Sequence, residues 1–243
     1  MIPSKLRKKA REALKGSWGK AALIMLVYFF VISCISIIAN SFPEGTIWYS
    51  LAYVIYMLLS IPLAYGLTIS FLKLERKEDV KTFDFLYTNF STAWNVCIQA
   101  IAKMIIPIAC FFFIALLLTI FVVTKIPMTW FYGIIFVAFY IAALVYFIAR
   151  GLLYSLSFYI AFDNENLSAK ECVEKSEELM MGNRGNLFLL ELSFIGWIIL
   201  GVFTLGIAYL WIFPYIQVSV ATFYDEVNTS KTKEVDGSNK IEE

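Results

Sequence analysis

The sequence predicts an all-α fold: a polytopic helical membrane protein with six transmembrane helices and short cytoplasmic amphipathic helices. Composition is the first reason. Apolar residues make up 60% of the 243 positions, charged residues only 16%, and the mean hydropathy is +0.74, a combination that soluble domains rarely reach. The second reason is that the apolar residues gather in runs of about 18 or more, enough to cross about 30 Å of hydrocarbon at about 1.5 Å per residue.

The apolar runs divide the chain into spans, surface helices and a tail. Six spans are predicted at about 21–40, 47–72, 95–123, 128–158, 187–203 and 207–224, within a transmembrane domain of residues 21–227. Residues 1–20 form a predicted cytoplasmic amphipathic helix, with further cytoplasmic helices near 79–93 and 168–181. Residues 228–243 are polar and carry no periodic pattern, so we expect a disordered cytoplasmic tail.

The distribution of basic residues predicts the orientation, because Lys and Arg in short loops stay on the cytoplasmic side. Of the 20 Lys and Arg residues, 18 lie in segments 1–20, 73–81, 150–184 and the tail. We therefore expect a multi-pass protein of the cell (cytoplasmic) membrane with both termini in the cytoplasm. A cleaved signal peptide is the alternative for the first apolar run, but at about 18 residues this run is longer than the usual 7 to about 15.

Two surface helices carry clear patterns. In residues 1–20, apolar positions recur at helical spacing among seven Lys and Arg, which predicts a helix lying on the anionic inner leaflet. In residues 168–181, Ser168 and Glu171 form a capping box and Gly182 ends the helix. The candidate residues of this cytoplasmic interaction helix are Ser168, Glu171, Ser176, Met180 and Arg184.

The composition also restricts chemistry. The chain has no His, so His bases, Ser-His-Asp triads and His-ligated metal or haem sites are excluded. Its four Cys residues lie in different segments without CxxC spacing, which argues against a metal cage or a disulfide framework. We expect no enzymatic activity, no cofactor, no metal and no nucleic-acid partner.

Three ionisable residues fall inside the predicted spans: Lys103, Arg150 and Glu191. An ionised side chain at a helix centre costs about 3 kcal/mol or more, so each needs a partner or a route to the interface. The first hypothesis is a polar cluster in the inner half of the membrane that gates or binds an anion. The second is that Lys103 and Arg150 extend to the inner surface while Glu191 pairs structurally with one of them.

Three prolines lie within predicted spans: Pro62, Pro107 and Pro214. Each leaves a backbone carbonyl without its helical donor and permits a kink. Kinks can line a cavity or pack a tight bundle. Gln217, one turn after Pro214, is a candidate to satisfy freed backbone groups.

The segments before spans 1 and 5 share one form, a surface helix followed by Gly-x-x-Gly and a span. Spans 2 and 6 also correspond, with Pro62 before Ser70-Phe71 and Pro214 before Thr222-Phe223 at the same spacing. We hypothesise three units, each a cytoplasmic helix plus a transmembrane hairpin; coincidence within a low-complexity apolar sequence is the alternative.

The third unit carries specific motifs at residues 163–171, Ser176, 179–182, 187–197 and 211–215. Together with Ala10 to Trp18 near the N-terminus, these motifs resemble a bacterial integral-membrane family, domain of unknown function 975. Glu165 departs from the proline that members usually place soon after the Asp. The resemblance implies a multi-pass protein of the bacterial cytoplasmic membrane and implies no activity.

These features favour a non-enzymatic accessory, scaffold or assembly factor, because nearly all polar mass lies on the predicted cytoplasmic side. Its expected partners are the anionic inner leaflet of the lipid bilayer and a membrane or cytoplasmic protein. A transporter or lipid-handling protein is one alternative. An immunity or protective protein against membrane-active peptides is another.

Overall fold

The structure, a computed structural model, describes residues 2–125 and 130–239, and all regular secondary structure in these ranges is helical, as predicted. A single 3₁₀ turn, η1 (Asp84–Leu86), interrupts the α-helices of this part of the chain. In chain order the α-helices are α1 (Pro3–Ala13), α2 (Trp18–Asn40), α3 (Ile47–Glu75), α4 (Phe90–Lys125), α5 (Trp130–Tyr154), α6 (Ser157–Asp163), α7 (Ala169–Met180), α8 (Arg184–Leu192), α9 (Ile195–Phe203) and α10 (Tyr209–Asn239).

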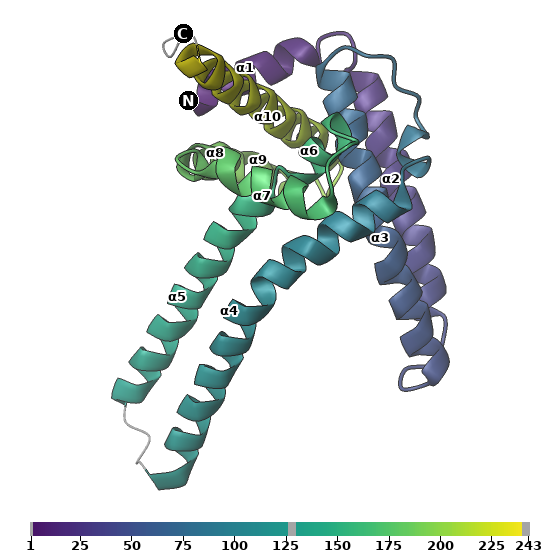
Figure 1. The fold of residues 1–243 in the computed structure, drawn as a ribbon. Coiled ribbons are helices and arrows are strands. Elements are labelled where there is room, and N and C mark those ends of the chain that lie inside the picture. The colour runs from purple at the N-terminus through teal and green to yellow at the C-terminus, as the bar shows by residue number, and fades with distance from the viewer. Residues whose placement is uncertain (1, 126–129, 240–243) are drawn as a thin grey trace.

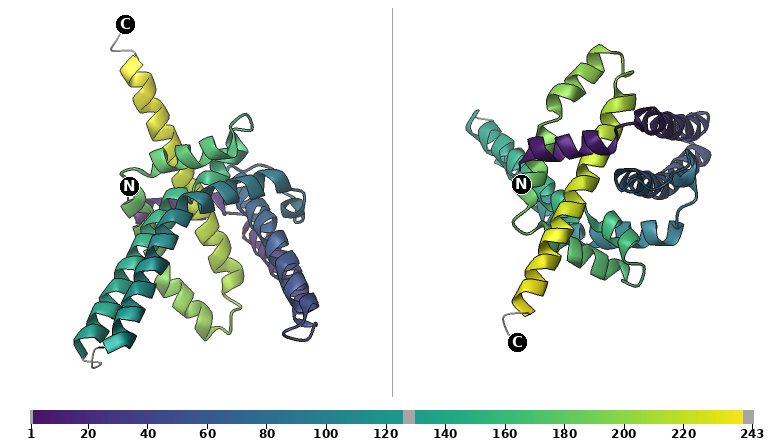
Figure 2. Two further views of the ribbon diagram at one scale, coloured as in Figure 1. Left: turned by 60° about the horizontal axis from the view of Figure 1, so that its bottom comes forward. Right: turned by 90° about the horizontal axis from the view of Figure 1, so that it is seen from above.

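The long helices form three hairpins that spread from a common end of the molecule (Figures 1 and 2). Hairpin 1 consists of α2 and α3, and hairpin 2 of α4 and α5. Hairpin 3 pairs α8 and α9 with the first part of α10. The C-terminal part of α10 projects from the opposite side of the common end (Figure 2, left).

We call the common end the platform: α1, η1, α6, α7 and the adjoining ends of the three hairpins. The largest buried side chains gather there, among them Phe71, Phe85 and Phe223. The apolar face of α1, with Leu6 and Ala10, is buried within this core and packs against α10. The apolar face of α1 is therefore not available to lipid, and the exposed residues of this helix are polar and mostly basic.

Within residues 2–125 and 130–239, four helical segments are long and apolar enough to cross a membrane. In their apolar windows, only 17%, 44%, 11% and 22% of the residues are buried within the protein. Helices with apolar surfaces on most sides and satisfied backbone groups suit a lipid environment. The segments are Trp18–Asn40, Ile47–Glu75, Val137–Asp163 and Arg184–Phe203.

Three predicted elements differ from the structure. Instead of a helix near 79–93, the chain makes a turn, in which the Lys81 N–H donates to the Asp84 carboxylate at 2.8 Å, and then η1. The predicted span 187–203 is broken between α8 and α9, where Arg7 donates to the Ser193 carbonyl at 3.2 Å. The predicted disordered tail begins at residue 228, whereas α10 continues as helix to Asn239.

Candidate functional site

Of the three ionisable residues that were predicted to lie within spans, two come together and the third does not. The Lys103 ammonium lies 2.6 Å from a Glu177 carboxylate oxygen, and the nearest Arg150 nitrogen lies 4.0 Å from the other oxygen. Glu174 lies 3.9 Å from Lys103. Glu191 is exposed on α8 and makes no ion pair among the described residues. Pairing with Glu191 was therefore the wrong prediction; the carboxylate comes from α7, a helix outside the spans.

Glu177 remains ionised in this setting. Burial disfavours its charged form, but the hydrogen bond from Lys103 and the positive charges of Lys103 and Arg150 outweigh that cost and hold the pKa of Glu177 below its ordinary value. The cluster therefore places two cations around Glu177, with Glu174 of the same helix beside Lys103, and it links α4, α5 and α7.

The same cluster satisfies a carbonyl that a proline leaves free. Pro107 lacks the N–H that would bond the Lys103 carbonyl, and Arg150 donates to that carbonyl at 3.4 Å. Pro62 likewise frees the carbonyl of Leu58, which accepts from the Trp94 indole at 3.2 Å. At both prolines the free carbonyl is therefore satisfied by a side chain from another helix.

Pro214 has no such side-chain donor in the described residues. Gln217, the candidate for this role, makes no hydrogen bond within 2–125 or 130–239. Pro62 and Pro214 are buried and Pro107 is partly buried.

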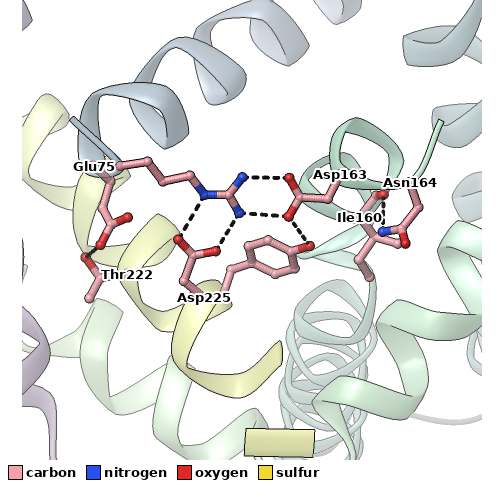
Figure 3. A network of polar contacts seen from close by, with 8 residues as sticks. Glu75, Ile160, Asp163, Asn164, Thr222 and Asp225 are labelled. Atoms are coloured by element: carbon pink, nitrogen blue, oxygen red, sulfur yellow. Dashed lines mark hydrogen bonds and ion pairs between the residues drawn. The ribbon is translucent and has the colours of Figure 1, made fainter. Parts of the chain in front are cut away.

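A second ionic cluster joins the three hairpins and was missed by sequence reasoning. Arg76, just after α3, donates to both oxygens of Asp163 at 2.7 Å and to both oxygens of Asp225 at 3.1 and 2.6 Å. Tyr224 adds a hydrogen bond from its hydroxyl to Asp163 at 2.8 Å. Figure 3 shows the two aspartates on either side of the guanidinium, and the contact between the Thr222 hydroxyl of α10 and the Glu75 carboxylate of α3.

This cluster is well shielded. The exposed fractions of the Arg76, Asp163 and Asp225 side chains are 27%, 18% and 29%. Two-pronged guanidinium–carboxylate pairs are among the strongest hydrogen-bonded contacts in proteins. The hydrogen bonds that Arg76 donates to Asp163 and Asp225 outweigh burial and raise the pKa of Arg76 above its ordinary value. The platform ends of hairpins 1, 2 and 3 are thus held together at one point.

The predicted interaction helix is α7, and most of its apolar face is not free. Ser168 and Glu171 form the predicted capping box. Ser176 is fully buried and donates to the Leu153 carbonyl at 2.7 Å, and Met180 is fully buried. Arg184 is the first residue of α8. Because Ser176 and Met180 pack inside the protein, only the outward, charged side of α7 can meet a partner.

No metal centre is present in the part of the chain that the structure describes, where no group of three or more Cys, Asp or Glu side chains is arranged to hold an ion. The described cysteines, Cys34, Cys97 and Cys172, are free; Cys110 lies among the residues whose side chains are not described.

Comparison with known proteins agrees with the resemblance noted from the motifs. No curated protein and no solved structure matches the chain. The family model described as "Protein of unknown function (DUF975)" matches residues 1–231, nearly the whole chain. The protein therefore belongs to the DUF975 family.

Proposed function

We propose that this protein is a non-enzymatic membrane scaffold or assembly factor that presents the outward surface of its platform to a protein partner in the cytoplasm or the membrane. One observation carries the proposal: Arg76 fastens the ends of three hairpins at a single point, while the apolar surfaces of those hairpins stay largely exposed. A rigid surface at one end and a lipid-facing body at the other suit a scaffold.

The proposal includes six spans in the cell membrane. Four segments meet the length and hydropathy that a span needs. The remaining long helices, α4 and the first part of α10, lie beside α5 and α9 in hairpins 2 and 3 (Figure 2), so they would cross with their neighbours. An even number of spans puts both termini on the platform side, and the basic residues on that side favour the cytoplasm.

Burial supports the three-unit repeat in hairpins 1 and 3. When the segment of α1 and α2 is aligned with the segment of α7 and α8 at a constant shift of 166 positions, buried residues align with buried residues. Gly16 and Gly182, which correspond under this shift, both adopt positive φ, at 89° and 81°, a conformation that favours glycine after a helix. The buried pairs are Leu6 and Cys172, Ala10 and Ser176, Leu14 and Met180, Ala21 and Leu187, and Ile24 and Leu190.

The second helices of these hairpins correspond under a shift of 152 positions. Ser70 and Thr222 are both buried, and each donates to the carbonyl one turn earlier at 2.9 Å. Phe71 and Phe223 are both fully buried. Shared packing at a fixed shift favours duplication of a helix-plus-hairpin unit over coincidence, and it explains why the hairpins converge on one platform.

The outward surfaces of α1 and α7 are the proposed contact region. On α1 the exposed side chains are mostly basic, including Lys5 and Lys8. On α7 the exposed side chains include Glu171 and Glu178. These helices carry opposite charge, so the proposed partner has a polar surface of mixed sign, whereas the anionic inner leaflet would contact only α1.

Site-specific photocrosslinking tests the proposal. A photoreactive residue is placed at Lys8, at Glu178 or, as the matched control, at Trp48, which is also exposed but lies at the far end of hairpin 1. We expect one protein partner to crosslink from Lys8 or Glu178 in native membranes and not from Trp48. Crosslinks to protein from Trp48 alone would contradict a platform-based scaffold.

Reporter fusions test the orientation. A reporter enzyme active only outside the cytoplasm is fused after Glu243 or inserted at Glu44, between α2 and α3. We expect activity at Glu44 and silence after Glu243. Activity after Glu243 would overturn both the span count and the proposed position of the platform.

A further inference from the structure

A cavity of about 700 Å³ lies at the platform, apart from both ionic clusters. Its walls come from the end of α3, from η1 and the loop after it, from the first turns of α4, and from the junction of α6 and α7. The volume falls within the range of about 300–1,000 Å³ that small-molecule sites occupy. The wall contains apolar side chains such as Ile69 and Phe162 beside many polar ones.

Three donors on the wall have uncommitted side-chain polar groups. Tyr65 is only 5% exposed, yet its hydroxyl has no hydrogen-bond partner among the described residues. The Lys73 ammonium has no carboxylate partner there and lies 5.3 Å from the centre of the Phe162 ring. The Thr92 hydroxyl makes no hydrogen bond within the same ranges. Because all three groups lie on the cavity wall, they can donate hydrogen bonds to acceptor oxygens of a ligand in the cavity.

The wall contains two carboxylates, and one of them is uncommitted. The Glu165 carboxylate makes no hydrogen bond or ion pair in the part of the chain that the structure describes. The other carboxylate, Asp84, accepts from the backbone N–H of Lys81 at 2.8 Å. Neighbouring hydroxyls are occupied, because Ser70 donates to the Gly66 carbonyl and Thr88 to the Pro62 carbonyl.

We propose that this cavity binds a phosphoethanolamine group, with its phosphate at Lys73, Tyr65 and Thr92 and its ammonium at Glu165. A phosphate offers several acceptor oxygens, which matches three donors of which one is cationic. An ammonium offers three donors and a positive charge, which matches a free carboxylate. Neither a simple anion nor a simple cation would use both sets of groups.

Two molecules could supply the phosphoethanolamine group: phosphatidylethanolamine, through its headgroup in the leaflet beside the platform, and free phosphoethanolamine in solution. The site is independent of the proposed scaffold function, because its donors come from α3 and α4 and not from the outward surfaces of α1 and α7.

Native mass spectrometry of the full-length protein tests the lipid source. The protein is released from mixed micelles that contain phosphatidylethanolamine and phosphatidylglycerol at equal mole fraction, the second lipid lacking an ammonium. We expect one retained phosphatidylethanolamine per protein in at least threefold preference over phosphatidylglycerol. Titration calorimetry with free phosphoethanolamine tests the soluble source, and binding in either experiment supports the site and identifies the source.

Variants assign the binding to the named groups. Lys73→Gln and Glu165→Gln should each weaken binding at least tenfold, and Tyr65→Phe, which removes only a hydroxyl, about threefold. Glu178→Gln, exposed on α7 and outside the cavity wall, is the matched control and should bind as the wild type does. Unchanged melting temperatures would exclude misfolding, and Tyr65→Phe provides a test if a charge variant fails to fold.

The proposal is overturned if neither phosphatidylethanolamine nor phosphoethanolamine binds. Equal retention of both lipids without binding of phosphoethanolamine would also overturn it, because Glu165 would then have no role. Binding that Lys73→Gln and Glu165→Gln leave unchanged would place the ligand elsewhere and have the same consequence.

Discussion

The two ionic clusters of the platform have opposite charge layouts. At Arg76 one cation lies between two carboxylates, Asp163 and Asp225, whereas at Glu177 one carboxylate lies beside two cations, Lys103 and Arg150. In each cluster the two partners of the central residue come from other helices. Removing the central residue leaves like charges facing each other, so it should cost far more than removing a partner.

The largest expected effect is that of Arg76→Ala. It leaves two shielded carboxylates without their cation, so we expect a loss of about 3 kcal/mol in the free energy of unfolding, measured as a lower melting temperature in mild detergent. Arg76→Lys should be intermediate, because an ammonium cannot make two-pronged contacts with both carboxylates. Lys8→Ala, at an exposed position, is the control; equal losses for Arg76→Ala and Lys8→Ala would refute the role of the cluster.

Glu177→Gln should have the next largest effect. The amide keeps a hydrogen-bond acceptor but removes the charge between Lys103 and Arg150, for an expected loss of about 2 kcal/mol. Glu191→Gln, which changes the exposed carboxylate that the sequence had singled out, should stay within about 0.5 kcal/mol of the wild type. If Glu191→Gln lowers the melting temperature more than Glu177→Gln does, Glu177 is not the carboxylate that pairs with Lys103 and Arg150.

Acid should abolish the difference between the wild type and Glu177→Gln. The pKa of Glu177 in the folded protein lies below its ordinary value of 4.5, so its charge stabilises the fold above that value, and this contribution is lost as the pH falls through the folded pKa. We expect a constant difference in melting temperature above about pH 5.5 that narrows on acidification. A difference that grows with acid would contradict the lowered pKa.

The smallest effect concerns the kink of α4. Pro107→Ala restores an N–H for the Lys103 carbonyl, which would make the 3.4 Å hydrogen bond from Arg150 redundant. Arg150→Met should therefore cost about 0.5–1 kcal/mol less in the Pro107→Ala background than in the wild type. The free energies of unfolding of the wild type, the two single variants and the double variant complete this double-mutant cycle. Strictly additive losses would mean that the Arg150 side chain does not stabilise α4 at Pro107.

Much of the fold could be predicted from local patterns. The apolar runs located the helical segments of hairpins 1 and 2, and Ser168 with Glu171 located the start of α7. The predicted helix near 79–93 was wrong, because the burial of Phe85 against other elements decided that loop. The break at Ser193 was also not predicted, because the Arg7 side chain that donates to the Ser193 carbonyl lies far away in the sequence.

The candidate site was only half predictable. An ionisable residue in an apolar run is conspicuous, so Lys103 and Arg150 could be singled out. Their partner Glu177 could not, because it lies in a helix where acidic residues are common. Arg76, Asp163 and Asp225 stood out even less, since each sits at a hairpin end where charged residues are expected.

The sequence alone determined the helical class, the apolar segments and the membership of the DUF975 family, because these depend on composition, periodicity and motifs within short stretches of chain. Only the tertiary structure decided which charges pair, which face of α1 and α7 is buried, and where a cavity with uncommitted polar groups remains. The physical reason is distance along the chain: Arg76 meets Asp225 across 149 positions, and no local pattern reports a contact of that range.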